Sequence, residues 1–487
     1  MRILLPSFLL LVCLSSCLDD EDYTTSTSDV LRFSVDSVAF DTIISGEPTN
    51  TYTFTVYNPA SKAIRIPRVY LECGDSSCFS VNVDGTTLVS GEGEDFEIAS
   101  KDSMLVFLNA NVPETDVDDP VFVEDNLVFV TEAGVEQKVN LSASGQTVID
   151  LTSYHVTGSE MLSANRPYRV MDSLVVDVGA TLYVMPGTRV YFHSEAELIV
   201  HGSVQILGTL ASPVTFRGDR MGYMFDGQPY DRIPGQWGGV VLASESYDNY
   251  ISYADIHSGN FGIRVDSSDV SLSKLVMENS IVHNTIGDGI SSRMSQIYVG
   301  NSQITNSGGT CVKVRGGYVT FIHCTIARFY VFTGGDGYAL EFSNYDDDVR
   351  LPLTLAQFAN CIITGYQDDE VMGTINDAYP DDAYDYAFFN CLFNTTHPDE
   401  EDSRLVNCLW DDAEGDDAVS RDGNFYPEFD IDALSFSFEL NPKSQAIGAA
   451  DASISELYYP QDRLGRTRVS DDIAPDIGCL QHQTTEE

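Results

Sequence analysis

Apolar and polar residues alternate between residues 30 and 149 in the manner of β-strands. The alternation is clear in Leu31–Val35, Thr51–Val56 and Ile64–Ile66. Because successive side chains of a strand point to opposite faces of a sheet, this period of two predicts strands with one buried face. Turn residues separate the runs at hairpin intervals, and no convincing helical stretch intervenes. We therefore expect residues 30–150 to form a small β-sandwich. About seven short strands over roughly 120 residues would fit an immunoglobulin-like arrangement.

A different pattern follows, in which a turn residue precedes Ser or Cys and then apolar residues. The Ser and Cys positions are 280, 302, 324, 361, 391 and 408, so the successive steps are 22, 22, 37, 30 and 17 residues. A repeat of this kind predicts a solenoid. A 22-residue step fits one coil of three short strands, longer steps indicate inserted loops, and the last step suggests a truncated coil.

The residues before this repeat resemble the opening coils of right-handed parallel β-helix proteins. Short strands punctuated by Gly and Pro run through Leu182–Phe192, Leu198–Thr209 and Ser212–Phe216, and Gln236–Val240 follows. The resemblance implies an all-β chain with a pectate-lyase-like solenoid over residues 151–440. It specifies a fold and not an activity.

The C-terminal residues resemble the ending of many surface-located bacterial β-helix proteins. The matching segments are Ser444–Gly448, Asp462–Arg468 and Ala474–Gly478, and Cys479 stands where Ala is usual. The resemblance implies that residues 441–487 form a cap, knotted by Arg and Asp, that covers the last coil. Such a cap would protect an open sheet edge from aggregation.

Stacking explains the residues of the repeated turn. Equivalent side chains of neighbouring coils lie about 4.8 Å apart, so an Asn at a turn can hydrogen-bond its copy in the next coil. Small residues suit the crowded position that follows. Cys324, Cys361, Cys391 and Cys408 are therefore expected to form a buried thiol stack. The alternative is a metal or redox site, for which no C-x-x-C with partner histidines is present.

The N-terminal residues predict an export signal. Ile3–Leu14 is apolar but too short to span a bilayer. Leu14–Cys17 resembles the bacterial lipoprotein box, which implies a signal peptide at residues 1–16, lipidation of Cys17 and a tether over residues 17–29. The acidic run after Cys17 resembles the address of surface lipoproteins in Bacteroidota, so we expect a lipid anchor in the outer membrane and exposure at the cell surface.

Export permits a local disulfide between Cys73 and Cys78. The alternative is two unrelated thiols at a loop. No catalytic constellation is evident in the N-terminal domain.

The strongly negative net charge restricts the classes of molecule that the chain is expected to bind. The chain has 26 Lys+Arg against 74 Asp+Glu, a formal net charge of −48. Nucleic acid is therefore an unlikely partner, since a phosphate backbone is bound through Lys and Arg.

Much of the acid falls in inserted loops rich in Tyr and Asp, namely residues 218–235, 329–352 and 366–386. The last two insertions follow the same coil position, so they should emerge on one side. Tyr offers stacking surfaces, and Asp accepts hydrogen bonds from sugar hydroxyls. The candidate glycan-binding residues are Tyr338, Tyr345, Asp346, Asp347, Asp368, Asp369, Tyr379, Asp381 and Tyr384. Ca²⁺ is a further candidate ligand of these carboxylates, although their spacing does not match an EF-hand.

The leading hypothesis is a surface lipoprotein that binds or presents extracellular polysaccharide. The enzyme alternative is a polysaccharide hydrolase or lyase, and the third class is a stalk or adhesin. Polygalacturonase-type β-helix hydrolases use a Gly-His-Gly that is missing here, so no catalytic residue is assigned. Lys313 and Arg315 alternate on one strand and should share a face near His323, either facing an anion or simply solvated.

Overall fold

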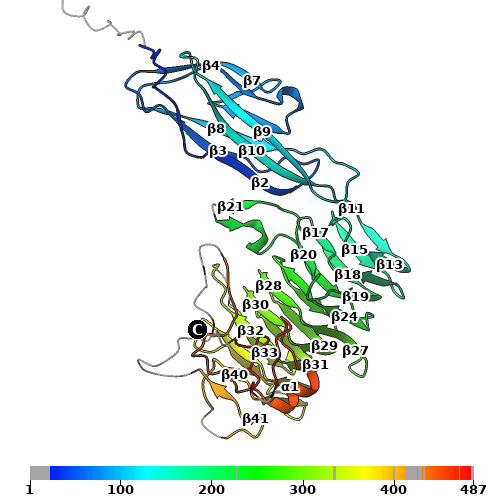
Figure 1. Cartoon of the computed structure of the whole chain (residues 1–487). Helices are drawn as coiled ribbons and strands as arrows, with labels where there is room; N and C mark the ends of the chain where they lie inside the picture. The colour runs from blue at the N-terminus through cyan, green and yellow to red at the C-terminus, as the bar shows by residue number, and fades with distance from the viewer. Residues whose placement is uncertain are drawn as a thin grey trace, which may run out of the picture. The chain divides into compact units, whose positions relative to one another are not determined.

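A computed structural model describes residues 22–225, 227–332, 336–398, 401–411, 425, 430, 434–470 and 472–483. The signal peptide and Cys17 lie outside these residues. The chain divides into two compact units, one ending at Gln146 and the other beginning at Thr147. Figure 1 shows both units, which are built almost wholly from strands.

The N-terminal unit contains two five-stranded sheets. The first sheet consists, in spatial order, of β1 (Arg32–Phe33), β3 (Tyr52–Tyr57), β8 (Ser103–Ala110), β5 (Phe79–Val83) and β6 (Thr86–Thr87). The second consists of β2 (Ser37–Ile44), β10 (Glu136–Gln146), β9 (Val121–Val130), β4 (Ile64–Leu71) and β7 (Glu92–Ile98). A short 3-10 helix, η1 (Gly74–Ser76), precedes β5.

One hydrophobic core joins the two sheets. Phe54 and Val106 from the first sheet and Ile66 and Phe129 from the second belong to the same buried cluster. All strand pairs are antiparallel except β2 with β10, which are parallel. The expected β-sandwich is confirmed, with ten strands where the alternation indicated about seven.

The second unit is a parallel β-helix whose coils each contribute up to three strands. We call the three columns of stacked strands row 1, row 2 and row 3, in the order in which the chain visits them. Row 1 consists of β12 (Tyr154–Val156), β15 (Ser173–Val176), β18 (Glu197–Val200), β23 (Gly239–Leu242), β26 (Ile263–Val265), the first parts of β29 (Ile290–Gly300) and β31 (Val312–Ile322), β33 (Leu340–Ser343) and β38 (Val371–Thr374).

Rows 1 and 2 form one 17-stranded sheet, because β29 and β31 turn the corner without a break. Row 2 consists of β13 (Ser159–Leu162), β16 (Thr181–Val184), β19 (Ser203–Leu207), β24 (Asn249–Ser252), β27 (Ser273–Glu278), the second parts of β29 and β31, β36 (Leu353–Ala359), β39 (Tyr384–Phe389) and β41 (Leu405–Val406).

Row 3 is a separate 11-stranded sheet, and much of it can be followed from β17 to β40 in Figure 1. It consists of β11 (Ile149–Leu151), β14 (Tyr168–Val170), β17 (Arg189–Phe192), β20 (Val214–Gly218), β25 (Ala254–His257), β28 (Ile281–Thr285), β30 (Gln303–Ser307), β32 (Thr325–Arg328), β37 (Ile362–Gly365), β40 (Leu392–Phe393) and β42 (Leu409–Trp410).

The turn between rows 2 and 3 carries the repeated motif. Its first residue has a left-handed backbone in every copy, with φ of 48° to 53° at Asn279, Asn301, His323, Asn360, Asn390 and Asn407. Asn tolerates this conformation better than most residues because its short side chain hydrogen-bonds locally. The strands that follow pair in register through all five steps, including the 17-residue step that pairs Leu392 with Leu409.

The small residue of the turn forms the expected buried column. Cys324, Cys361 and Cys391 are fully buried, and Cys408 is half-buried. Each thiol lies within hydrogen-bonding distance of the carbonyl two residues earlier, as the hydroxyls of Ser280 and Ser302 do. Cys and Ser are thus equivalent at this position.

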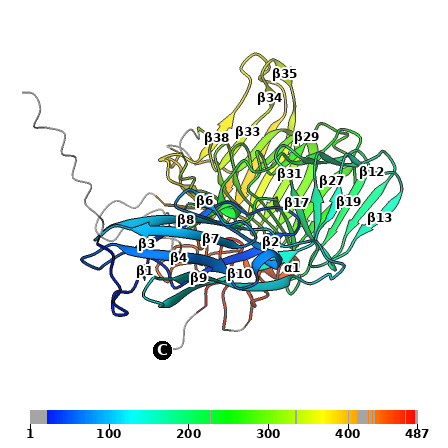
Figure 2. The same cartoon turned by 90° about the horizontal axis from the view of Figure 1, so that it is seen from above.

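The large insertions do not form single loops. A row 1 strand interrupts each of the second and third, so that residues 329–339 and 366–370 join row 3 to row 1, while residues 344–352 and 375–383 join row 1 to row 2. Residues 344–352 contain the hairpin of β34 (Tyr345–Asp346) and β35 (Val349–Arg350), which Figure 2 shows standing out beyond β33 and β38. The first insertion contains β21 (Tyr223–Phe225), β22 (Gln228–Pro229) and the 3-10 helix η2 (Tyr230–Arg232).

The C-terminal segment lies along the side of the solenoid, in contrast to the expected cap over its last coil. Asn390 donates to the carbonyl of Ala449 near the start of the segment. Further along, Tyr459 donates to Glu278, which lies 181 residues earlier in the chain. The segment therefore runs back along the turn between rows 2 and 3, where it supplies partners to ladder residues such as Asn360. It includes α1 (Ala452–Tyr458). In the described part of the chain no helix is long and apolar enough to cross a membrane.

Candidate functional site

Six charged side chains gather on the outer face of row 1. Along β31 the valines at 312 and 314 point inward, so Lys313 and Arg315 point outward. The parallel register places Arg293 beside Arg315 on one neighbouring strand and Glu341 beside Lys313 on the other. Asp288 and Asp346 approach from the loops at the two edges of the row. We call these six residues the row 1 charge cluster.

The cluster is held by mutual ion pairs. Lys313 Nζ lies 3.5 Å from Asp288 Oδ2 and 3.9 Å from Glu341 Oε2. Arg315 Nη2 lies 2.5 Å from Glu341 Oε1. Side-chain exposures range from 15% at Arg315 to 39% at Arg293 and Asp346. The groups are thus fixed in position and still accessible.

Asp346 ties the β34–β35 hairpin to this cluster. Its carboxylate accepts a hydrogen bond from Arg293 Nε at 2.9 Å and lies 3.9 Å from Arg315 Nε. Arg293 also donates to the Ser267 hydroxyl at 2.9 Å. Asp346 is the candidate glycan-binding residue that joins the cluster, through its contacts with Arg293 and Arg315.

The other candidates divide between the two edges of row 1. Tyr345, Asp347, Tyr379 and Asp381 lie on the edge toward row 2, where Arg350 pairs with Asp382 and lies 4.3 Å from the centre of the Tyr379 ring. Tyr338, Asp368 and Asp369 lie on the edge toward row 3, because row 1 strands interrupt both insertions. The expectation that these loops emerge on one side is therefore wrong, because they lie along both edges of row 1.

Tyr384 and His323 lie in other environments than the sequence predicted. Tyr384 is half-buried against the solenoid core, with its ring stacked on Phe342 at 5.8 Å. His323 is not near Lys313 and Arg315: it is buried in the turn between rows 2 and 3, 2.8 Å from the Ser455 hydroxyl. Burial lowers the pKa of His323 well below its usual range.

The thiols of the N-terminal unit are both free. Cys73 is exposed and Cys78 is half-buried. A bond between them stays a prediction for the oxidised protein.

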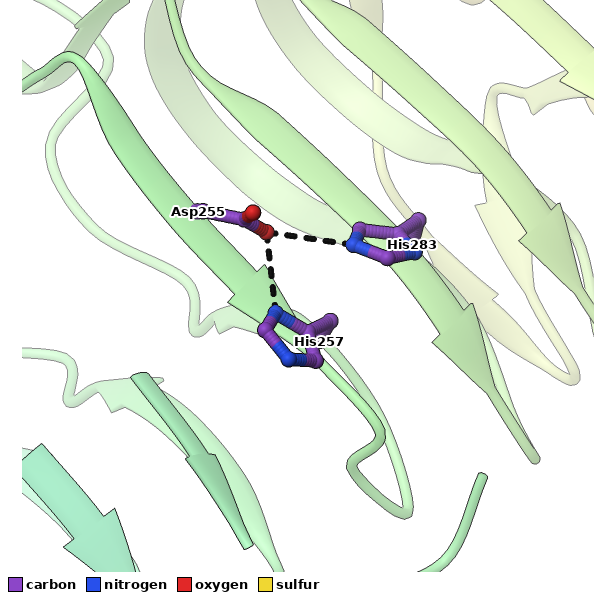
Figure 3. A group of neighbouring side chains, drawn as sticks. All are labelled: Asp255, His257 and His283. Atoms are coloured by element: carbon purple, nitrogen blue, oxygen red, sulfur yellow. Dashed lines mark hydrogen bonds and ion pairs between the residues drawn. The ribbon is translucent and has the colours of Figure 1, made fainter. Parts of the chain in front are cut away.

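A second polar cluster, built from Asp255, His257 and His283, lies on the outer face of row 3. Asp255 and His257 share one face of β25, and His283 on β28 is in register with His257. Asp255 Oδ1 lies 2.9 Å from His257 Nδ1 and 3.1 Å from His283 Nε2, as Figure 3 shows. The sequence signal that could have indicated this cluster is an Asp-x-His followed by a His about one coil later.

The first insertion covers this cluster. Asp231 of η2 lies 2.9 Å from His257 Nε2 and 2.5 Å from Arg217 Nη1. Burial alone would lower the pKa of His257, but Asp255 and Asp231 raise it to about 9. Burial opposes ionisation of Asp231, yet its contacts with His257 and Arg217 lower its pKa to about 2.

A cavity of about 320 Å³ adjoins His283. Row 3 supplies Gln303 and Thr305, the first insertion supplies Arg232, and the residues just before the C-terminal segment supply Phe436 and Glu439. Among the described residues, Asp255, His257 and His283 are the group of His, Cys, Asp or Glu side chains whose ligand atoms converge. Calcium binding by the Tyr/Asp loops therefore stays a prediction.

Comparisons with known proteins agree with the solenoid and leave the activity open. A family model described as "Right handed beta helix region" matches residues 238–369. No curated protein matches the chain.

Several solved structures match parts of the chain. The pectate lyase Pel9A is matched over 69% of this chain and 88% of that chain, at 12% identity and a TM-score of 0.36. The E. coli chaperone DraB is matched over 24% and 54%, at 14% identity and 0.17. A PapD-like domain of human CEP192 is matched over 28% and 97%, at 14% identity and 0.17. This chain spans only about half of the DraB structure and 31% of a Vibrio cholerae protease, VesB.

Proposed function

We propose that this protein binds extracellular polysaccharide along the outer face of row 1. The observation that supports the proposal is the row 1 charge cluster, in which three cations and three carboxylates fix one another between two edges of inserted loops. Side chains already held in place lose little conformational freedom when a ligand arrives, which favours binding.

The chemistry of the cluster suits sugar hydroxyls. Each guanidinium offers five N–H donors and each carboxylate offers two acceptor oxygens. Strands along the row repeat at about 4.8 Å, so a long polymer can meet similar groups in successive coils. Tyr345 and Tyr379 on one edge and Tyr338 on the other are candidates to contact sugar rings.

A second candidate function is hydrolysis of the bound chain. Asp288 Oδ2 and Glu341 Oε2 both contact Lys313 Nζ, so these two oxygens lie at most 7.4 Å apart, the sum of the two contact distances. Glycosidases place their two carboxyl groups roughly 5 to 9.5 Å apart. The upper bound of 7.4 Å falls within this range, and the hydrolase alternative rests on the two carboxylates sharing Lys313.

The test is a glycan panel, with and without Ca²⁺, that measures both binding and release of products. Lys313→Ala and Arg315→Ala should each weaken binding about tenfold, the equivalent of roughly 1.4 kcal/mol. Lys138→Ala, which removes an exposed ion pair in the N-terminal unit, is the matched control and should bind normally. Glu341→Gln should abolish product release if the protein is a hydrolase. A chain that neither binds nor cleaves any glycan would refute both functions and leave the stalk.

The proposed location is the bacterial outer membrane, with a lipid on Cys17 after removal of residues 1–16. Support comes from the lipoprotein box and the acidic run that follows it. Acyl chains would supply the membrane affinity, at about 0.8 kcal/mol per buried CH₂. Cys17→Ala should release the protein from the membrane fraction. Surface exposure is tested by proteinase treatment of intact cells.

A further inference from the structure

We propose that Asp255, His257 and His283 bind a divalent transition-metal ion of the Zn²⁺ class on the outer face of row 3. This site is separate from the row 1 charge cluster, and the inference does not rest on the proposed function. It is argued from strand register, ligand geometry, the surrounding hydrogen bonds and the neighbouring cavity.

Strand register brings the three ligands together. Asp255 and His257 are two residues apart on β25, so both point outward. β28 is the next strand of row 3, and its His283 is the register partner of His257. The two imidazole rings stack with centroids 4.8 Å apart, which is the coil spacing. Regular stacking therefore positions a carboxylate and two imidazoles without a special loop.

The ligand atoms already lie near coordination distances from one another. Asp255 Oδ1 is 2.9 Å from one imidazole nitrogen and 3.1 Å from the other, and all three ligand atoms lie within 4.8 Å. A tetrahedral ion with bonds of about 2.0 to 2.1 Å separates its ligands by roughly 3.3 Å. The carboxylate oxygen thus needs to move by only a few tenths of an ångström. The two imidazole rings, stacked at an interplanar angle of 28°, must turn so that both nitrogens point at one ion.

The surrounding hydrogen bonds are those of a metal-binding histidine. Such a histidine usually donates its other ring N–H to a carboxylate, which fixes the ring and its tautomer. Here His257 Nε2 faces Asp231 Oδ1 at 2.9 Å, while Nδ1 faces Asp255. Arg217 in turn holds Asp231 at 2.5 Å. Asp231 is therefore a positioning residue, and the ligand nitrogen of His257 is aimed at the site.

The competing occupant of the site is a proton. Both ring nitrogens of His257 face carboxylates, so each is placed to donate a hydrogen bond, and a proton on Nδ1 competes with the metal for that nitrogen. Metal binding would break the Nδ1–H bond, form an Nδ1–metal bond and release one proton to solvent. Two imidazoles and one carboxylate favour Zn²⁺, Co²⁺, Ni²⁺ or Cu²⁺ over Ca²⁺ and Mg²⁺, which prefer oxygen ligands.

The neighbouring cavity leaves room for a further ligand. His283 lines the cavity of about 320 Å³ together with Asn284, Gln303 and Thr305. Three protein ligands with an open fourth position are typical of zinc sites that bind water or a small molecule. The polar lining would accept such a ligand.

The test titrates Zn²⁺, Co²⁺ and Ca²⁺ into EDTA-treated full-length chain by calorimetry, and records the Co²⁺ absorption spectrum. We expect one Zn²⁺ per chain, a Co²⁺ spectrum typical of nitrogen ligands, and no heat from Ca²⁺ at this site. His283→Gln should weaken Zn²⁺ binding at least 100-fold, and Asp231→Asn about 10- to 100-fold. His201→Gln, a half-exposed histidine paired with Glu245, is the matched control.

Two outcomes would overturn the site. One is the absence of stoichiometric Zn²⁺ binding to the wild type. The other is binding that His283→Gln leaves unchanged, which would place the metal elsewhere. Because His257→Gln removes a buried ion pair and could unfold the unit, thermal melting supplies a second readout. One equivalent of Zn²⁺ should raise the melting temperature of the wild type but not that of His283→Gln, since a ligand stabilises only the form that binds it.

Discussion

At the scale of single residues, the thiols of the turn column are structural. Burial raises the pKa of Cys324 and Cys391 well above the usual range, and little reactive thiolate forms. In reduced native protein, iodoacetamide should modify the exposed Cys73 within minutes and leave Cys324, Cys361 and Cys391 unlabelled until the protein unfolds. Mass spectrometry of tryptic peptides measures this order. Rapid labelling of the three buried thiols in the native state would contradict the column.

Lys274 is a second residue whose environment predicts a measurable effect. It is fully buried, donates to the Ala243 carbonyl at 2.7 Å, and burial lowers its pKa to about 8. Below pH 8 the lysine is charged in both states, and burying that charge costs up to about 3 kcal/mol. Between pH 8 and the unfolded pKa of about 10.5, the unfolded chain binds more protons, so stability rises with pH.

Lys274→Met should therefore raise the free energy of unfolding at pH 7 by up to about 3 kcal/mol. The advantage over the wild type should shrink between pH 8 and 9.5 in urea titrations. Lys443→Met, at an exposed position of the same unit, should change little. A pH-independent difference would contradict this account.

At the scale of elements, the left-handed turn residue decides how rows 2 and 3 meet. Asn360 has φ of 53°, donates to the carbonyl of Asp451 and accepts from its N–H at 2.8 Å. Asn360→Gly keeps the backbone conformation and loses these bonds. Asn360→Ala loses the bonds and also strains the backbone, so its unfolding free energy should be lower by about 1 kcal/mol more. Equal losses in denaturant titrations would show that the backbone there carries no strain.

The C-terminal segment shows why motif resemblance reached the right element but the wrong place. Arg468 is fully buried and donates to Asn301 and to the Gly478 carbonyl. Asn301 itself donates to Asn279, the equivalent turn residue of the preceding coil. Arg468 therefore joins the C-terminal segment to the stacked asparagines of the turn. The sequence motif identifies a knot of Arg and Asp whose bonds are partly local, but Arg468 also donates to Asn301, 167 positions earlier. Only the folded chain brings them together.

At the scale of the whole molecule, the two units have separate cores. The buried cluster of the first unit ends at Ala143 and that of the second begins at Leu151, with no residue in common. We expect two unfolding transitions in differential scanning calorimetry, one for each core. Residues 22–146 expressed alone should reproduce one transition, and residues 147–487 the other. A single transition in the full chain that neither fragment reproduces would show that the units fold as one.

The sequence by itself determined the fold class, because both of its signals are local and periodic. Alternation sets the faces of the strands from Leu31 onward, and the turn motif fixes the register of Ser280, Ser302 and the cysteines after them. Only the tertiary structure determined which side chains come together in the two polar clusters. Asp255 meets His283 and Lys313 meets Glu341 only because coils stack in register, while Asp231 and Asp346 arrive from insertions of irregular length. Side chains that converge from different coils have no common spacing along the chain, so their chemistry appears only once the solenoid is wound.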